Sequence, residues 1–466
     1  MLKNLLTLVG VVAVVGCRPV ESSSSTPTSD GGTVSSSAPE INYTGTRQGI
    51  SATEILVGNT AATSGGYAAV GIPFNLAMNV VFQEYNYYHT RKIKLQHYDD
   101  TFDGSIGLTQ TTKLVEEDHV FALVGHFGTN TVNSTVDYIQ EKGIPMVYGV
   151  TGVNSLYFEH DPGNPILSIQ PIYRTEGKVL LARILHEKLY GAQKNAAFPA
   201  NGKVVLLYTE DDAGNSIRVG VEEEATFAGI TLQKFPFTVE TAASVAAQAK
   251  AASPAAIIVA SNQPGFTATV TALKSVTNTA PVFSSYVNAN ATNVTSDGSA
   301  LPFDVYANAW VDIVDAAAPG PLHPDLQALP YGEITLPAAA FPGFTEEYWA
   351  EYVRLMVSSD LSDGVTTAGS LWANNFAVAG FVAAKAFVAL LDRVDLDRVT
   401  WDSFIQVAES APLDLPLCGE IDWGNGSRVG LDTLSLNRYY PISDTHATSG
   451  FDKVRPTEGL ATIRAK

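Results

Sequence analysis

Residues 54–100 read EILVGNTAATSGGYAAVGIPFNLAMNVVFQEYNYYHTRKIKLQHYDD. The opening apolar run predicts a strand, and the glycine-rich AATSGGYAAVG after it predicts a loop. Residues 72–88 then have helical spacing, and residues 92–100 predict a second strand. Strands that alternate with helices build parallel sheets, so this stretch indicates an α/β fold.

The same alternation continues to residue 150 and then starts again. Further strands are expected at 121–128 and 144–150, and a second series of strands at 203–214, 230–238, 255–263 and 280–289. Helices are expected between them, and also at 177–191 before the second series. Two such series predict two lobes, each a doubly wound parallel sheet, with ligand-binding residues at the carboxyl ends of the strands.

Two later stretches depart from this pattern. Residues 315–343 are rich in proline and predict a surface insertion. The apolar run FAVAGFVAAKAFVALL (376–391) carries Lys385 and has helical periodicity, which indicates a buried helix of a folded domain.

The first 44 residues do not predict a folded domain. Lys3, an apolar run at 5–15 and Gly16 precede Cys17, in the order of a secretory signal. The run is too short for an ordinary membrane-spanning helix, and VVGC resembles the lipobox of bacterial lipoproteins, in which the cysteine is acylated. We therefore expect a signal peptide at 1–17 with Cys17 as lipid anchor, and a flexible tether at 18–44. The alternative is a short anchor helix with an incidental cysteine.

Charge and cysteine content restrict the partners. The 466-residue chain carries a net charge of -19, which argues against nucleic acid or an anionic membrane surface as partner. Contact with a membrane is therefore expected through the lipid anchor only. Cys418 has no partner once Cys17 is acylated, so we expect no disulfide and a buried, structural Cys418.

The order of these segments carries a family resemblance. EILVGNTAATSGGYAAVG, KIKLQHYDD, FALVGHFGTNT, IPMVYGVTG, KVVLLYTEDDAG and AAIIVASNQ together resemble the type I periplasmic binding proteins, in particular the Leu/Ile/Val-binding subgroup that feeds ABC transporters. The resemblance extends over about residues 51–440, including the closing segment from Trp401.

The resemblance implies two lobes joined by a three-stranded hinge. It places the chain crossings near Ile169–Tyr173, Tyr306–Val311 and Cys418–Trp423. Lobe I then comprises 45–169 and 311–418, and lobe II comprises 170–310 and 419–455. Such a hinge allows the lobes to close on a ligand.

Candidate ligand-binding residues follow the strands of the first lobe. The loop after the first strand offers Ser64 and Tyr67, and the third strand ends at Phe127, Gly128 and Thr129, where a hydroxyl and helix N–H groups can hold a carboxylate or carbonyl. The next strand leads to Val150, Thr151 and Gly152. The resemblance implies that Thr129, Val150 and Gly152 match the positions that hold the α-carboxylate in amino-acid binders of the family, while Thr151 lies one residue away. The alternative is that Thr129 or Thr131 only caps a helix.

In the second lobe the candidates are Tyr173, Asp212, Asn262 and Tyr286. The family's acid for the ligand ammonium is not matched near Val287. Asp211 or Asp212 is a possible substitute, although such an acid commonly caps the next helix. Tyr173 either forms an aromatic wall or packs in the hinge core.

Catalysis is not expected. His126 with Asp99 and Asp100 suggests a base and its orienting group, but no nucleophile motif accompanies them. The eight histidines show no metal-ligand spacing, and we expect neither metal nor cofactor.

The sequence therefore predicts an extracytoplasmic solute-binding lipoprotein of the bacterial envelope. It is expected to capture an amino acid, amide or related small solute and to deliver it to the membrane subunits of an ABC-type permease. The alternative is a ligand-sensing or envelope-assembly lipoprotein of the same fold, and the ligand's identity stays open.

Overall fold

The structure, a computed structural model, describes residues 41–311, 346–372, 374–416 and 418–466. The expected signal peptide, Cys17, most of the expected tether and the insertion at 315–343 lie outside these residues.

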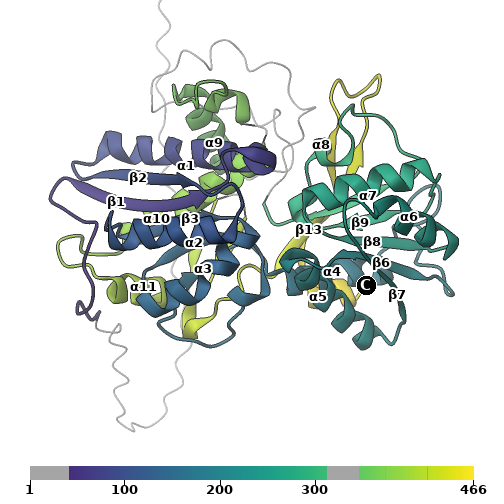
Figure 1. Cartoon of the computed structure of the whole chain (residues 1–466), viewed down its shortest axis with the longest axis horizontal. Coiled ribbons are helices and arrows are strands. Elements are labelled where there is room, and N and C mark those ends of the chain that lie inside the picture. Colours follow the sequence, from purple (N-terminus) through teal and green to yellow (C-terminus); the bar gives the residue numbers. More distant parts are fainter. Residues whose placement is uncertain (1–40, 312–345, 373, 417) are drawn as a thin grey trace, which may run out of the picture. The chain divides into compact units, whose positions relative to one another are not determined.

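The first sheet in the described chain has five parallel strands in the order β2-β1-β3-β4-β5. Figure 1 shows β1, β2 and β3 of this sheet beside α1 and α2. β3 is buried along its whole length, as expected for a parallel strand covered on both faces. The strands are β1 (Glu54–Ala61), β2 (Lys92–Asp99), β3 (Ala122–Phe127), β4 (Met146–Val150) and β5 (Ile166–Leu167).

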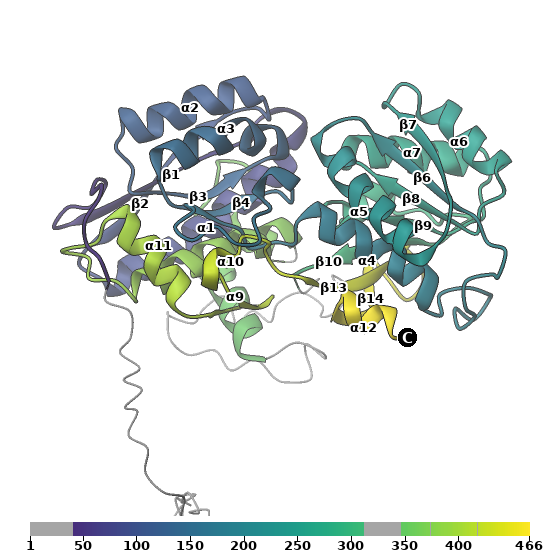
Figure 2. The same cartoon turned by 90° about the horizontal axis from the view of Figure 1, so that it is seen from below.

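Helices cover both faces of this sheet. In Figure 2, α2 and α3 lie on one side of the strands, and α1 and α10 lie on the other. These helices and their neighbours are α1 (Ala68–Tyr88), α2 (Gly104–Glu116), α3 (Thr129–Lys142), α9 (Glu346–Ser358), α10 (Asn375–Leu391) and α11 (Trp401–Ser410), with short 3-10 turns η1 (Gly65–Tyr67), η2 (Asn154–Leu156) and η6 (Ala368–Leu371).

Helix α1 packs directly on α10. Residues 65–88 are long and apolar enough to cross a membrane by composition, but α1 buries much of its surface in the protein, as a core helix does. The expected buried helix at 376–391 is confirmed as α10. The two backbones meet at Gly380, where an added Cβ would lie 2.1 Å from the carbonyl oxygen of Phe74.

The second sheet in the described chain has the order β14-β13-β10-β9-β8-β6-β7. Strands β6 to β10 pair in parallel, as expected, whereas β13 pairs antiparallel with β10 and with β14. Its strands are β6 (Val204–Thr209), β7 (Leu232–Phe237), β8 (Ala256–Ala260), β9 (Val282–Ser284), β10 (Val305–Ala309), β13 (Thr433–Tyr440) and β14 (Gly450–Gly459).

The helices of the second sheet also lie on two faces. α4 packs on α5 and α12, and α6 packs on α7; Figure 1 shows these two groups on opposite sides of β8 and β9. The helices are α4 (Tyr173–His186), α5 (Asp212–Ala228), α6 (Ala242–Ala251), α7 (Gln263–Ser275), α8 (Ala291–Val294) and α12 (Leu460–Arg464).

The chain passes between the sheets after β5 and again before β13. The expected third crossing at Cys418–Trp423 needs correction: β12 (Gly419–Ile421) pairs with β11 (Leu413–Leu415), and η7 (Gly424–Gly426) contacts α11. The chain joins the second sheet only at Thr433. Cys418, expected to be buried, is half-buried. The return after β10 leads into residues outside the described chain, and the lobe boundaries stay a prediction.

The strand expected at 280–289 ends earlier. β9 stops at Ser284, and η3 (Tyr286–Asn288) follows. The carboxyl group of Glu176 on α4 accepts hydrogen bonds from the Ser285 hydroxyl (2.7 Å) and from the Tyr286 N–H (2.7 Å). Because this carboxyl group takes the N–H that would continue the strand ladder, the chain turns and presents Tyr286.

Burial governs the protonation of Glu176. Its side chain is completely buried, and this desolvation raises its pKa to about 8 against the lowering effect of the hydrogen bonds. The group therefore holds a proton in the folded protein at neutral pH.

We expect the Glu176 proton to make stability depend on pH. Because the folded-state pKa of about 8 lies above the ordinary value of 4.5, the folded state binds more protons between these values, and stability falls as pH rises through this window. The slope is at most about 1.4 kcal/mol per pH unit. Urea unfolding at pH 5.5, 7 and 8.5 should show a smaller decline for Glu176→Gln than for wild type and for the exposed control Glu117→Gln. If the stability of Glu176→Gln declined with pH as steeply as that of wild type, the result would contradict a buried, protonated Glu176.

A second prediction concerns Gly380. Alanine normally favours a helix over glycine by about 1 kcal/mol, but here its Cβ would meet the Phe74 carbonyl. We expect Gly380→Ala to lower the free energy of unfolding by about 1–3 kcal/mol, as overpacking does. Gly66→Ala is the control, since nothing lies within 4 Å of its Cβ. A Gly380→Ala protein as stable as wild type in urea would contradict this prediction, because it would show that the two helices can move apart to accommodate the added methyl group.

Candidate ligand-binding site

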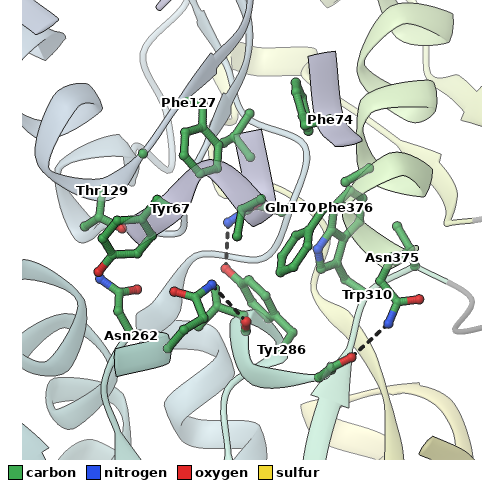
Figure 3. Close-up of a pocket in the computed structure, with 18 of the residues that line it drawn as sticks. Tyr67, Phe74, Phe127, Thr129, Gln170, Asn262, Tyr286, Trp310, Asn375 and Phe376 are labelled. Carbon is green, nitrogen blue, oxygen red and sulfur yellow. Dashed lines mark hydrogen bonds between the residues drawn. The ribbon is translucent and has the colours of Figure 1, made fainter. Parts of the chain in front are cut away.

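A pocket of about 700 Å³, including solvent at its mouth, is lined from elements of both sheets. Figure 3 shows Tyr67, Phe127 and Thr129 on one side and Asn262 and Tyr286 on the other. No lining side chain in the described chain is charged. Nine lining residues are aromatic, and the rest are polar, aliphatic or glycine: Tyr67, Phe74, Phe102, Phe127, Tyr148, Tyr173, Tyr286, Trp310, Phe376; Thr129, Gln170, Asn262, Gln263, Asn375; Val70, Gly128, Val150, Val287, Ala289, Ala309, Val311, Ala379.

Six of the aromatic rings form a continuous series. Tyr67 stacks on Phe102, with ring centroids 3.8 Å apart and planes at 14°. From Phe102 the series continues at centroid distances of 6.3, 6.4, 6.1 and 5.6 Å through Phe127, Phe74, Tyr148 and Trp310. Aromatic pairs prefer such stacked and tilted arrangements, so the rings support one another as a wall.

Tyr173 and Tyr286 form a second aromatic surface. Their rings stack at 5.7 Å and 29°. The Tyr286 hydroxyl donates to the Pro171 carbonyl at 2.7 Å and accepts from the Gln170 amide at 2.9 Å. A Cβ at Gly152 would lie 2.3 Å from the Tyr286 hydroxyl oxygen, so only glycine leaves room for this ring.

Gln170 connects the two surfaces. Its amide oxygen accepts from the Tyr148 hydroxyl, and its amide nitrogen donates to the Tyr286 hydroxyl. Burial raises the pKa values of the Tyr148 and Tyr286 phenols well above the ordinary value, so both phenols stay protonated. Figure 3 shows the Gln170 amide directed at Tyr286.

The polar end of the pocket lies at the start of α3. Gly128 is the N-cap of this helix, without a side-chain cap, and Thr129 follows as its first residue. The Thr129 hydroxyl lies 3.0 Å from the Thr151 hydroxyl and 3.5 Å from that of Tyr173. The alternative that Thr129 only caps the helix is therefore wrong. Thr131 does not cap it either, since its hydroxyl donates to Asp100 at 2.8 Å.

Tyr67 and Asn262 face each other at this polar end. Figure 3 shows the Tyr67 hydroxyl and the Asn262 amide pointing toward one another from opposite sides. Burial, then the charge of Asp211, raises the pKa of Tyr67 to about 12, so the phenol is protonated. Neither side chain has a hydrogen-bond partner within the described ranges, and both remain available to a ligand.

Eight of the twelve expected ligand-binding residues line the pocket: Tyr67, Phe127, Gly128, Thr129, Val150, Tyr173, Asn262 and Tyr286. Tyr173 combines both expected roles, because it is buried in the core and also lines the pocket. Their contact with a ligand stays a prediction.

The other four expected residues do not line the pocket. Ser64 is exposed at the start of η1, and Thr151 lies behind Thr129. Gly152 is covered by the Tyr173 and Tyr286 rings. Asp212 is exposed and accepts from the Asn133 amide at 2.9 Å, while Asp211 caps α5 by accepting from the Gly214 N–H.

Sequence reasoning missed the deeper aromatic residues. Phe74 lies inside α1, Phe376 at the start of α10 and Trp310 directly after β10. Their positions in helices or after a strand in a different part of the chain give no local sign of a binding site. Gln170 lies at the expected first crossing, but its bridging role depends on Tyr148 and Tyr286, which are far away in sequence.

The arrangement of His126 gives no acid–base pair. The ring is completely buried, and desolvation lowers its pKa to about 3. Its nitrogens lie 3.1–3.4 Å from the hydroxyls of Thr60, Thr111 and Thr135. Asp99 accepts from the Thr63 N–H instead. Within the described ranges no cluster of three or more His, Cys, Asp or Glu is placed to hold a metal ion.

Comparisons with solved structures show the same fold in ABC transporter proteins. A fatty acid ABC transporter substrate-binding protein from Thermomonospora curvata superposes with a TM-score of 0.65 at 15% identity, over 90% of this chain and 96% of that one. A substrate-binding protein from Desulfitobacterium hafniense in complex with Leu gives 0.58 at 16% identity, over 86% and 100%. A solute-binding protein from R. palustris in complex with benzoate gives 0.60 at 14% identity, over 87% and 98%.

Comparison at the level of sequence identifies the family. No curated protein matches the sequence. The family model for periplasmic binding proteins matches residues 54–300, which is more than half of the chain. The chain therefore belongs to the periplasmic binding protein family, and it has the fold of ABC transporter substrate-binding proteins.

Proposed function

We propose that the protein is an extracytoplasmic receptor that captures a small organic solute in this pocket and delivers it to an ABC-type permease. The observation that carries the proposal is the lining: residues from both sheets surround one pocket, and most of the rings that form it are buried. Concave, mainly apolar sites with a few fixed polar groups are typical small-molecule sites. Family membership supports the extracytoplasmic location and the transport partner.

Capture requires that the two sides separate and close. Hydrogen bonds that join them near the pocket include those from the Asn375 amide to the Ala289 carbonyl (2.8 Å), from the Asn133 amide to Asp212 (2.9 Å) and from the Gln170 amide to the Tyr286 hydroxyl (2.9 Å). A ligand that touches both sides favours the closed state, and this differential affinity shifts the equilibrium. A shift from about 1% to about 99% closed needs about 5.5 kcal/mol.

The proposed location includes a lipid anchor. Acylation of Cys17 would hold the protein on the envelope membrane, and residues 18–44 would tether the folded part near the permease. A permease that recognises the closed form would then receive loaded receptor.

Ligand binding should be visible through Trp310. This side chain lines the pocket and has an edge-to-face contact with Tyr148, so a bound solute changes its environment. We expect one or more members of a panel of amino acids, amides, short peptides and aromatic acids to raise the melting temperature and to change tryptophan fluorescence.

The control variants separate the pocket from the rest of the protein. Trp310→Phe should lose most of the fluorescence response, whereas Trp401→Phe, on α11 and outside the lining, should keep it. If no compound in a broad panel shifts either signal, the receptor proposal fails.

Thr129 should matter for binding beyond its structural role. Thr129→Ala and Thr135→Ala each remove a buried hydroxyl on α3 that is hydrogen-bonded to another side chain, so each should lower stability by about 1 kcal/mol. Only Thr129 lines the pocket, so only Thr129→Ala should also weaken binding of the compound with the largest thermal shift, by about tenfold in calorimetry. Equal affinities of the two variants would assign Thr129 a purely structural role.

A further inference from the structure

The charge of the lining restricts what the pocket can hold. Within the described ranges it contains no Asp, Glu, Lys, Arg or His. Acidic side chains around it have other partners: Glu176, which holds a proton, accepts the Tyr286 N–H, Asp211 caps α5, and Asp212 accepts from Asn133. An ammonium group inside the pocket therefore finds no charged side chain in the lining to pair with, since Asp211 acts on Tyr67 from outside the lining.

Most polar side chains of the lining are already hydrogen-bonded within the protein. Thr129 contacts Thr151, and both ends of the Gln170 amide are bonded to phenols. The amide nitrogens of Gln263 and Asn375 donate to the carbonyls of Val287 and Ala289. A ligand consequently meets few open polar groups, of which the Asn262 amide and the Tyr67 hydroxyl face each other at one end (Figure 3).

The opposite end is made of rings. Figure 3 shows Phe74, Phe376 and Trp310 on the side of the pocket away from Tyr67, Thr129 and Asn262. Phe74 is completely buried and Trp310 is 6% exposed, so the ring surface is shielded from water. Aromatic walls of this kind bind the faces and edges of flat apolar groups.

We propose that the pocket selects a ring compound that carries no positively charged group, with its ring among Phe74, Trp310 and Phe376 and its polar group toward Tyr67, Thr129 and Asn262. The inference rests on the proposed receptor function and specifies its ligand class. It narrows the expectation of an amino acid, amide or related small solute. A desolvated ammonium without a partner carries a large free-energy cost, whereas a neutral amide or a carboxylate can use the hydroxyl and amide donors at the polar end.

A matched set of compounds on one skeleton tests this proposal. The probes are 3-phenylpropanamide, 3-phenylpropionate, phenylalanine and 2-phenylethylamine, with the corresponding indole compounds as a second skeleton. Calorimetry and tryptophan fluorescence on the full protein should show that the amide or the carboxylate binds at least tenfold more tightly than both amines of the same skeleton. Amines that bind as tightly as the amine-free probes would overturn the inference and leave the receptor function standing.

A substitution at Asn262 sharpens the test. Asn262→Asp places a carboxylate of nearly the same size at the polar end. It should therefore reduce the affinity ratio between amine-free and amine probes, here called the gap, at least tenfold. Asn201→Asp, an exposed position outside the lining, is the control and should leave the gap unchanged. An unchanged gap in Asn262→Asp would overturn the assigned orientation of the ligand. If no ring compound, amino acid or amide binds at all, the receptor proposal itself fails.

Discussion

The Gln170 amide is the contact on which the site depends. It lies where the chain leaves the first sheet, and it bonds Tyr148 of that sheet on one side and Tyr286 of the second sheet's η3 turn on the other. Because both ends of the amide are bonded to buried phenols, this side chain links the two aromatic surfaces in the arrangement that the structure shows. Such fully satisfied buried networks rigidify the structure around them.

The turn that presents Tyr286 is held in place by hydrogen bonds from the side away from the pocket. Glu176 holds the Ser285 hydroxyl and the Tyr286 N–H, and Gly152 leaves room for the ring. The carboxyl group of Glu176 therefore helps to shape the wall of the pocket and does not line it.

The sequence predicted the general fold and part of the site. Strand and helix alternation predicted the α/β fold and the parallel strands, and the rule that ligands bind at strand carboxyl ends led to Tyr67, Phe127 and Thr129. Asp212 lies outside the pocket lining because an acid at a helix start has competing partners, here Asn133. Phe74 and Phe376 were missed because their helices, distant in sequence, meet only through tertiary packing. The antiparallel β13 and β14 and the break at Ser285 likewise depend on non-local hydrogen bonds.

The backbone contact between α10 and α1 has a mechanical consequence for the site. At Gly380 no side chain separates α10 from the backbone of Phe74 on α1. The spacing between α1 and α10 therefore limits how far Phe74 and Phe376 can move apart. The breadth of solute that fits against Phe74 and Phe376 therefore depends on the main-chain spacing of two closely packed helices.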